Sequence, residues 1–532
     1  MTLLSVQNLS LSIHNFDILR DVSFNIDAGE IVAITGESGS GKSMTALAAM
    51  QLLPQGARTT GRIMLGGDDI TTWDEAALCK LRGNDIGMVF QEPMTALNPV
   101  QTIGDQVAET ILIHEQATKH AAHRRAAETL ERVGLPNDRY PLSRFPHELS
   151  GGQRQRVVIA MAIARHPRLL IADEPTTALD VTTQAQILKL LVRLAREDGM
   201  GLMMITHDLA VVAAMADRII VMRTGEIVEQ GLTKDLLYDM QHPYTKMLFA
   251  ASAHEVTLPR ANATAPLLEV KNVSRDYRTP RKTLFGKPGT FRAVNNVSFT
   301  LNQGERLGLV GESGCGKSTL TRALLGLEAV QEGSITLRGE PVFTGHKPNL
   351  NVRRHMQVVF QDPYGSFNPR YRVARQIAEP FHLLDAPPKG AARQQAIDAA
   401  LIAVGLTPTD AHKYIHEFSG GQRQRIAIAR ALIIRPDLII FDEAVSALDV
   451  SVRAQILDLL AELCASHNLS YLFISHDLSV VRTITDRVLV MKSGEIVEQG
   501  LTSDVFANPQ HPYTKSLIDA APVLPVLKGQ PL

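Results

Sequence analysis

The sequence predicts an α/β protein made of two related domains in tandem. Nearly every motif in the N-terminal half of its 532 residues recurs, in the same order, in the C-terminal half. In both halves, short apolar runs alternate with stretches of helical spacing, which is typical of a largely parallel sheet crossed by helices. The chain is also longer than one hydrophobic core usually organises, so more than one domain is expected.

The internal repeat is long and keeps its order. Its clearest pairs are GESGSGKS at Gly36 with GESGCGKS at Gly311, HELSGGQRQR at His147 with HEFSGGQRQR at His416, and QHPYTK, which is identical at Gln241 and Gln510. Later pairs are each 269 residues apart: Glu174 and Glu443, His207 and His476, and His242 and His511. A constant offset over this distance predicts two whole domains rather than a solenoid of small units.

The domain boundaries follow from the repeat. We expect one domain at 1–253 and a second at 267–532, joined by a linker at 254–266 that contains two prolines and no strong hydrophobic period. The second domain has an extra basic stretch, RTPRKTLFGKPGTFR, at 278–292, which is either a solvated loop or a segment that contacts nucleotide or a partner. Helical spacing and high helix propensity at 106–135 predict a mostly helical subdomain inserted into the first sheet domain.

Composition excludes several classes of protein. Hydrophobic residues make up 45% and charged residues 20%, as in ordinary globular proteins. With 54 Lys and Arg against 55 Asp and Glu, bulk charge does not favour nucleic acid, and no nucleic-acid partner is expected. The three cysteines form no closely spaced pair of the kind that holds zinc or an iron–sulfur cluster. Apolar runs such as 157–164 have about half the ~20 residues that a membrane helix needs, so a membrane role requires a partner.

Both glycine-rich segments match the pattern G-x-x-x-x-G-K-[ST] of a phosphate-binding loop between a strand and a helix. Backbone N–H groups of such a loop surround phosphates, the lysine reaches the β and γ phosphates, and the next Ser holds Mg²⁺. The residues expected to bind ATP in this way are Gly36, Glu37, Ser38, Gly39, Ser40, Gly41, Lys42, Ser43 and Met44, and in the second half Gly311, Glu312, Ser313, Gly314, Cys315, Gly316, Lys317, Ser318 and Thr319.

Polar residues at the ends of apolar strands supply the rest of a hydrolytic site. In each Asp-Glu pair, the Asp suits Mg²⁺, and the Glu can orient and deprotonate an attacking water. An isolated Asp-Glu pair or a lone strand-end His is more often structural, but here each recurs at the same offset. The expected metal ligands are Ser43, Gln91, Asp173, Ser318, Gln361 and Asp442; the expected catalytic residues are Glu174, His207, Glu443 and His476. Gln91 and Gln361 could also connect the metal or water to a mobile loop.

The SGGQ segments predict a second anion site in each half. A serine followed by two glycines exposes a hydroxyl and N–H groups at a helix start. One domain does not need two phosphate sites, whereas two domains that face head to tail can each close on the other's nucleotide. The residues expected to do so are Ser150, Gly151, Gly152 and Gln153, and Ser419, Gly420, Gly421 and Gln422.

This ordered set of motifs, present twice over nearly the whole chain, resembles the ATP-binding cassette (ABC) ATPases, which are P-loop NTPases. The resemblance implies a RecA-like sheet core and a helical subdomain in each domain, with ATP and Mg²⁺ as ligands. It also implies intramolecular head-to-tail pairing of the cassettes. One composite site would join the first domain's catalytic residues to Ser419 and Gly421, and the other would join the second domain's to Ser150 and Gly152.

A narrower resemblance concerns FQEPMTALNP, FQDPYGSFNP and the two QHPYTK segments, which look like the peptide/nickel importer branch in its fused double-cassette form. The resemblance implies a peripheral protein on the cytoplasmic face of the bacterial inner membrane that energises peptide import. Its partners would be two transmembrane permease subunits and, indirectly, a solute-binding protein. The main rival is a soluble twin-cassette factor that acts on the ribosome, but such factors have a long, charged helical linker. HPYT by itself is a weak signal, because its Tyr could simply pack at a helix end.

Some positions depart from the family pattern. Tyr277 matches the adenine-stacking aromatic of the family, whereas the first half offers only Ile13 and His14 there, unless Phe16 or the other domain supplies a ring. We therefore expect weaker nucleotide binding at the first site. Ala444 also replaces the proline at position 175, although no catalytic group is lost.

Overall fold

The computed structural model describes residues 2–532 except 92–95, 178, 260–264, 280–288, 346, 363–364, 447, 468, 523 and 525–532. The chain forms two compact units. The first consists of Met1–Ala253 with Asp449–Ser451 and Pro522–Leu532, and the second of His254–Leu448 with Val452–Ala521. Most of the basic insertion predicted at 278–292 lies outside the described residues.

A six-stranded sheet forms the centre of the first unit, in the order β10-β9-β3-β8-β7-β6. Its strands are β3 (Ile31–Thr35), β6 (Ile86–Val89), β7 (Leu169–Asp173), β8 (Gly201–Ile205), β9 (Arg218–Arg223) and β10 (Glu226–Leu232). All pairings are parallel except β9 with β10. Every residue of β3, β7 and β8 is buried, as the unbroken apolar runs predict for strands covered on both faces. The predicted α/β fold is thus confirmed.

A second, antiparallel sheet was not anticipated from the sequence. It has the order β2-β1-β4-β5. Its strands are β1 (Thr2–Ile13), β2 (Phe16–Asp27), β4 (Ala57–Leu65) and β5 (Asp68–Asp69). Its inner face shares one apolar cluster with β3, β7 and β8, so the two sheets enclose the helix that follows the phosphate loop.

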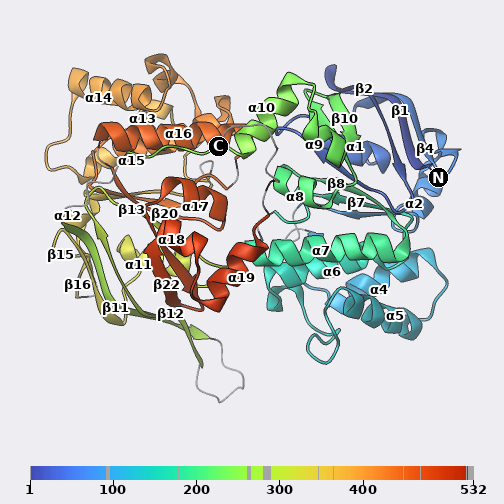
Figure 1. Ribbon diagram of the computed structural model, residues 1–532, viewed down its shortest axis with the longest axis horizontal. Coiled ribbons are helices and arrows are strands. Elements are labelled where there is room, and N and C mark those ends of the chain that lie inside the picture. The colour runs from blue at the N-terminus through green and yellow to red at the C-terminus, as the bar shows by residue number, and fades with distance from the viewer. Residues whose placement is uncertain are drawn as a thin grey trace. The chain divides into compact units, whose positions relative to one another are not determined.

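Helices complete the first unit. They are α1 (Lys42–Ala49), α2 (Glu75–Leu81), α4 (Ile103–His114), α5 (Lys119–Arg132), α6 (Gly151–Ile163), α7 (Val181–Asp198), α8 (Leu209–Met215), α9 (Thr233–Tyr238) and α10 (Pro243–Ser252). Thr102 and Thr118 cap α4 and α5 by accepting from backbone N–H groups in the first turn. In Figure 1, α4 and α5 lie at the end of the unit opposite β1 and β2, and they form the predicted helical subdomain.

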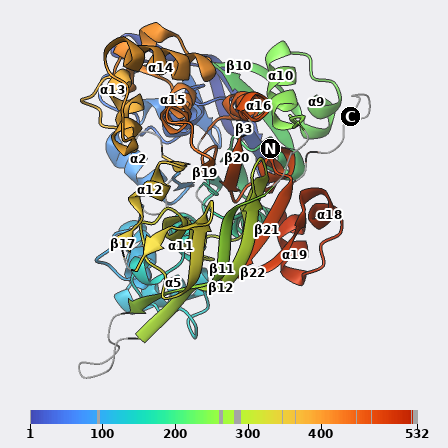
Figure 2. The same cartoon turned by 90° about the vertical axis from the view of Figure 1, so that its left-hand side faces the viewer.

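The second unit repeats this plan. Its sheets have the orders β18-β19-β20-β13-β21-β22 and β12-β11-β14-β15, with a small β16-β17 hairpin. The strands are β11 (Pro266–Thr279), β12 (Gly289–Asn302), β13 (Arg306–Val310), β14 (Glu332–Leu337), β15 (Glu340–Pro341), β16 (Phe343–Thr344), β17 (Lys347–Pro348), β18 (Met356–Val359), β19 (Leu438–Asp442), β20 (Ser470–Ile474), β21 (Arg487–Lys492) and β22 (Glu495–Leu501). Figure 2 faces this unit and shows α13 and α14 at the end opposite β11 and β12.

The helices of the second unit match those of the first in order. They are α11 (Lys317–Leu324), α12 (Leu350–Arg353), α13 (Val373–Ile377), α14 (Gly390–Ala403), α15 (Gly420–Leu432), α16 (Val450–His467), α17 (Leu478–Ile484), α18 (Thr502–Ala507) and α19 (Pro512–Ala520). The first part of the predicted linker, 254–259, forms no helix or strand and belongs to this unit. There His254 Nε2 lies 2.7 Å from Asp458 Oδ1 of α16, and Arg482 of α17 pairs with Glu255.

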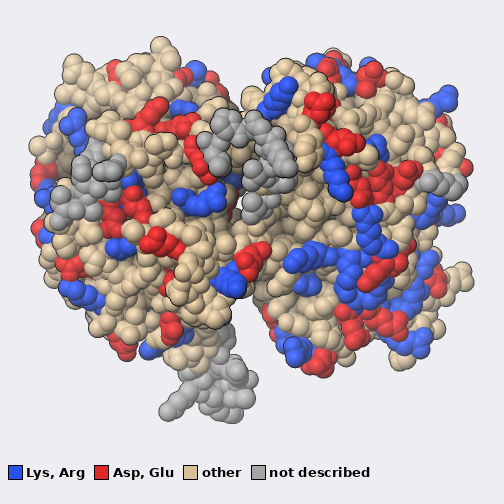
Figure 3. All heavy atoms as spheres, in the orientation of Figure 1, with Lys and Arg blue, Asp and Glu red and all other residues tan. Residues whose placement is uncertain are grey.

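The surfaces of the two units differ more than their interiors. Figure 3 shows Lys and Arg side chains gathered where Figure 1 places α7, which carries the exposed residues Lys189, Arg193 and Arg196. At the matching positions α16 carries Asp458, Glu462 and Ala465. Within the described part of the chain, no helix combines the length and apolar character needed to span a bilayer.

Candidate functional site

The first phosphate loop connects β3 to α1. Gly41 adopts a φ of 99° directly before the helix, and a Cβ on Gly36 would lie 2.1 Å from the carbonyl oxygen of Met222 in β9. Both positions therefore require glycine. Lys42 Nζ donates to the carbonyls of Gly36 and Glu37, at 2.8 Å each, so the lysine lies against the loop that it follows. Burial lowers the pKa of Lys42, although Glu174 and the neighbouring carboxylates oppose this shift.

The second phosphate loop has the same geometry between β13 and α11. Lys317 Nζ donates to the carbonyls of Gly311 and Glu312, at 2.7 and 2.8 Å. Cys315 takes the place of Ser40, and burial raises the pKa of its thiol. The replacement thus leaves a neutral side chain at this position of the loop. The two loops present the same lysine and serine to a ligand.

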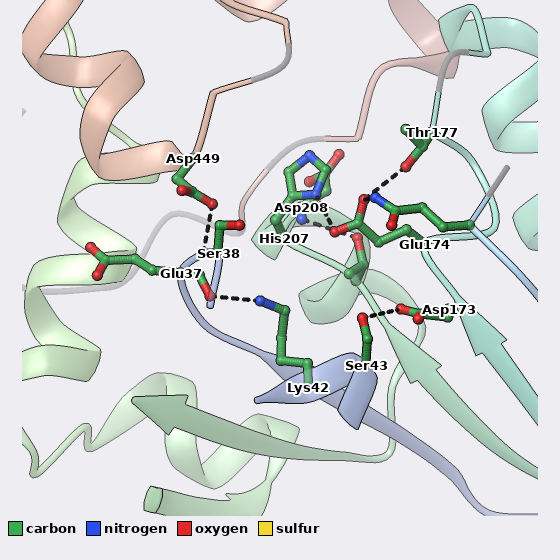
Figure 4. A network of polar contacts seen from close by, with 12 residues as sticks. Glu37, Ser38, Lys42, Ser43, Asp173, Glu174, Thr177, His207, Asp208 and Asp449 are labelled. Atoms are coloured by element: carbon green, nitrogen blue, oxygen red, sulfur yellow. Dashed lines mark hydrogen bonds and ion pairs between the residues drawn. The ribbon is translucent and has the colours of Figure 1, made fainter. Parts of the chain in front are cut away.

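Asp173 ends β7 beside the first loop. Ser43 Oγ donates to Asp173 Oδ1 at 3.2 Å, a contact visible in Figure 4. Burial raises the pKa of Asp173, and it raises the pKa of Asp442, the matching residue of β19, to about 6. A positive ion beside either group would favour its charged form.

A hydroxyl next to a carboxylate suits Mg²⁺, which commonly takes one or two protein oxygens and completes its shell with water and phosphate. The residues present therefore fit this ion. The described residues contain no group of three or more His, Cys, Asp or Glu that could hold a metal by themselves. A magnesium ion here would depend on phosphate oxygens for the rest of its ligands.

Glu174 is the most constrained side chain of the site. Its φ of 47° is unusual for a residue other than glycine, and strain of this kind concentrates at functional sites. His207 Nδ1 lies 3.3 Å from Oε1, while Thr177 Oγ1 and Gln91 Nε2 donate to Oε2 at 2.9 and 3.0 Å. Figure 4 shows His207 and Thr177 directed at this carboxylate. Burial by itself would raise the pKa of Glu174, but the hydrogen bond and charge of His207 help to lower it to about 2.

Glu443 repeats the arrangement in the second unit with one difference. Its φ is 52°, and His476 Nδ1 lies 3.4 Å from its Oε1. Burial opposes ionisation, but His476 lowers the pKa of Glu443 below its usual range. Gln361 Nε2 donates to Ser446 Oγ at 3.4 Å, whereas its counterpart Gln91 donates to Glu174. The roles of both glutamines as metal ligands stay predictions.

The SGGQ segments form the starts of α6 and α15. Ser150 and Gln153 make a reciprocal capping box, as do Ser419 and Gln422. A Cβ on Gly152 would lie 2.3 Å from Thr183 Cγ2 of α7, so packing between the helices requires this glycine. The serine and the second glycine thus have structural roles within their own units. Ser150 and Gly151 are exposed and Gln153 is partly exposed, so these residues are open to a ligand, whereas Gly152 is buried.

The predicted adenine-stacking residue, Tyr277, lies in β11. Its hydroxyl donates to Glu328 at 2.5 Å, and the Arg275 guanidinium lies 5.0 Å from its ring centroid. These contacts fix the ring on the surface of its unit. In the first unit, Ile13 ends β1 and His14 lies in the following turn with a φ of 47°.

Strand pairing shows a second aromatic in both units. Tyr277 lies opposite Phe291, and Ile13 lies opposite Phe16. Phe16 is 74% exposed and Phe291 is 55% exposed. Near this position the first unit therefore has the Phe16 ring and the smaller imidazole of His14, whereas the second has the rings of Tyr277 and Phe291.

Motif reasoning missed two contacts. Thr177 lies in a repeated segment, but the sequence did not indicate that its hydroxyl donates to Glu174. Tyr244 and Tyr513 of the QHPYTK segments accept from the backbone N–H groups of Glu37 and Glu312 in the phosphate loops, at 3.0 Å each. The verbatim recurrence of QHPYTK was the available signal, but the sequence did not show what the tyrosine contacts.

Two family models match the chain. The ABC transporter model matches residues 19–177 and 294–446, and the model of the oligopeptide/dipeptide transporter C-terminal region matches residues 228–271 and 497–530. Both models thus match twice, once in each half of the sequence.

Similar proteins include ATP-binding proteins named for transport or import. The peptidoglycan transport ATP-binding protein YejF of Agrobacterium fabrum is 46% identical over 98% of this chain and 96% of its own length. The glutathione import ATP-binding protein GsiA of Escherichia coli is 45% identical over 99% of this chain and 91% of its own length. A solved ATP-binding cassette, MJ0796 bound to ADP and Pi, is 32% identical over 43% of this chain and 98% of its own, with a TM-score of 0.39.

Proposed function

Because this chain belongs to the ABC transporter family and carries the C-terminal region of oligopeptide and dipeptide transporters twice, we propose that it supplies ATP hydrolysis to an importer of peptides or peptide-like substrates. Cassettes of this family bind and hydrolyse ATP. The observation that carries the proposal is the geometry repeated in both units, in which a lysine and serine of a phosphate loop lie near an Asp-Glu pair at a strand end. The relatives named for glutathione import and peptidoglycan transport support a peptide-like cargo.

In each unit the phosphate loop binds the nucleotide through backbone N–H groups, and Lys42 or Lys317 turns from the loop carbonyls to the β and γ phosphates. Ser43 with Asp173, and Ser318 with Asp442, would hold Mg²⁺, which neutralises phosphate charge when bound. Release of Lys42 from two carbonyls exchanges neutral acceptors for charged ones, which strengthens its hydrogen bonds.

Glu174 positions the attacking water. A carboxylate with a pKa of about 2 stays ionised at neutral pH, so it accepts a hydrogen bond from water at all working pH values. His207 and Thr177 fix its orientation from two sides, and Gln91 connects it to the loop that follows β6. Glu443 and His476 do the same in the second unit.

Exposed apolar side chains near the glutamines suit the permease partners. In the first unit, Phe90 next to Gln91 is 45% exposed, Val100 before α4 is 79% exposed, and Ile113 of α4 is 69% exposed. In the second unit, Phe360 next to Gln361 and Tyr371 before α13 are exposed. Exposed large apolar side chains favour a protein interface. We place a membrane permease on each of these surfaces, which makes the chain a peripheral subunit on the cytoplasmic side.

The two cassettes are further proposed to pair head to tail, with domain boundaries at 253 and 267. The exposed Ser150 and Gly151, and the matching Ser419 and Gly420, support this pairing because each could contact a nucleotide held by the other cassette. Limited proteolysis should cut between the domains within the predicted linker, 254–266, if those boundaries are right.

Reconstitution tests the transport function. The chain, its two permeases and their binding protein would be placed in liposomes, and ATP-dependent uptake of labelled glutathione and tripeptides would be measured. Uptake that depends on ATP and is lost in the double variant Glu174→Gln, Glu443→Gln supports the proposal. Failure to associate with any permease, together with ATP-dependent sedimentation with ribosomes, would favour the translation factor instead.

A further inference from the structure

The QHPYTK segments form the starts of α10 and α19, and each residue of the His-Pro-Tyr triplet has a separate task. His242 Nδ1 accepts from the backbone N–H of Tyr244 at 3.2 Å and thereby caps α10. Pro243 occupies the first helical position, where no N–H is needed. Tyr244 is second, so its side chain leaves the helix at a fixed angle. His511, Pro512 and Tyr513 repeat this geometry, with a cap of 3.1 Å.

The QHPYTK segment and the helix that it begins, residues 241–252 and 510–520, are called the tails here. A carboxylate from a strand of the same cassette holds each tail in place. Glu229 of β10 accepts from the backbone N–H groups of Gln241 and His242, at 2.7 and 3.2 Å. Glu498 of β22 accepts from Gln510 and His511 at 2.8 and 3.0 Å. These hydrogen bonds lower the pKa of each carboxyl group despite its burial, so Glu229 and Glu498 stay charged at neutral pH.

The tyrosine rings lie between the tail and the phosphate loop. Tyr244 and Tyr513 are buried, with a cation over each ring: Arg223 at 4.9 Å in the first unit and Lys492 at 4.8 Å in the second. Burial raises the pKa of Tyr244, so its hydroxyl stays neutral. In both units this hydroxyl accepts from the N–H of the second residue of the phosphate loop, at 3.0 Å.

This contact holds the loop at its start. The Glu37 peptide N–H is bound by Tyr244, while the Glu37 carbonyl accepts from Lys42 and Gly36 packs against Met222 of β9. When Lys42 turns to a nucleotide, the carbonyl keeps its bond from the Ser40 N–H, at 3.2 Å, and the Glu37 N–H keeps its bond to Tyr244. The loop can then keep the curvature that directs its later N–H groups to the phosphates. Pre-orientation of such donors strengthens binding because it avoids reorganisation when the ligand arrives.

We propose that Tyr244 and Tyr513 are positioning residues for ATP, and that each tail helix maintains the phosphate loop of its own cassette in the binding conformation. The inference rests on the proposed ATP site at Lys42 and Lys317. It gives the transporter C-terminal region a role in nucleotide affinity, separate from any contact with permeases. The two units make the same bond at the same distance from identical QHPYTK segments, so the contact is a repeated feature of the chain.

The test isolates one site at a time with Mg²⁺-ADP as the probe. In a Lys317→Ala background, Tyr244→Phe should raise the dissociation constant about tenfold, the effect expected for one buried hydrogen bond. Tyr513→Phe in that background should change it less than twofold, and the pattern should reverse in a Lys42→Ala background. Phenylalanine keeps the ring and the cation above it, so only the hydroxyl is lost. Tyr238→Phe, an exposed tyrosine at the end of α9, is the matched control.

Steady-state kinetics separate positioning from simple stability. The double variant Tyr244→Phe, Tyr513→Phe should raise KM for ATP while kcat at saturation stays within about twofold. A lower melting temperature with unchanged affinity and KM would show that the hydroxyls only stabilise the fold, and would overturn the inference. If Lys42→Ala and Lys317→Ala together left binding intact, the proposed ATP site would fail instead.

Discussion

Replacement of both glutamates should nearly abolish ATP hydrolysis. Glutamine has the shape of glutamate, but it is neutral and offers one carbonyl oxygen in place of two charged ones. In the first unit the carboxylate has three partners, His207, Thr177 and Gln91, which lie 2.9 to 3.3 Å from its oxygens. An amide can satisfy these partners only in part, and the oxygen left for water carries much less negative charge.

The magnitude follows from the loss of a positioned base. Such a group contributes about 10²–10⁴-fold, equivalent to roughly 3–5.5 kcal/mol in the activation free energy. Each single variant, Glu174→Gln or Glu443→Gln, should slow turnover because one of two sites is lost. The double variant should fall by the full factor. Because the pKa of Glu174 is about 2, the parent activity should show no acid limb from this group above pH 4.

The assay is phosphate release from Mg²⁺-ATP by the purified full chain at pH 7.5. Glu197→Gln, on the surface of α7, controls for a general loss of negative charge. ADP binding measured in parallel would show that the sites still fold. Hydrolysis by the double variant at the parent rate would refute the assignment of both glutamates.

Three further outcomes are expected. The single-site variants Lys42→Ala and Lys317→Ala should bind nucleotide unequally, with the first site weaker, and Tyr277→Ala should weaken only the second by about 1–3 kcal/mol of stacking. Asp477→Asn should lower the free energy of unfolding at pH 7 by about 1–3 kcal/mol, because it removes a charge-assisted bond to Arg453 at 2.7 Å while asparagine still caps α17. The chain expressed in cells should leave membranes on carbonate extraction, since its proposed attachment is through permeases.

The pH dependence gives the Asp477 prediction its sign. Burial opposes ionisation, but Arg453 and Ser479 lower the pKa of the folded Asp477 carboxyl below its usual range. Stability from this group is therefore present above about pH 4 and lost as the pH falls through the lower folded value. The parent should lose more stability than Asp477→Asn in that acidic range, with Asp519→Asn as a surface control. Equal acid sensitivity of parent and variant would contradict this reasoning. Equal nucleotide affinities of the two single-site variants would contradict the first prediction, and retention of the chain in the extracted bilayer would contradict the third.

The chemistry of the site could be predicted from the sequence because its determinants are local. A phosphate loop is one short segment whose glycines, lysine and serine act together, and Asp173 and Glu174 are neighbours at one strand end. The 269-residue offset between Glu174 and Glu443 then favoured a functional interpretation of these Asp-Glu pairs over a chance occurrence of a common dipeptide. The helical subdomain was predictable for the same reason, since the spacing at 106–135 reports the face that each helix buries.

Tertiary structure decided which of these segments meet. Tyr244 and Glu37 lie 207 residues apart, and strand order alone brings β10 and its tail helix to the loop after β3. No local sequence pattern specifies the order of strands in the sheet, because the same apolar runs could pair with one another in many different orders. Helix packing likewise places Gly152 so close to Thr183 that a larger residue would clash there. A motif shows which atoms a segment offers, whereas the partner of each atom depends on chain segments that only the folded sheet and helices bring within hydrogen-bond distance.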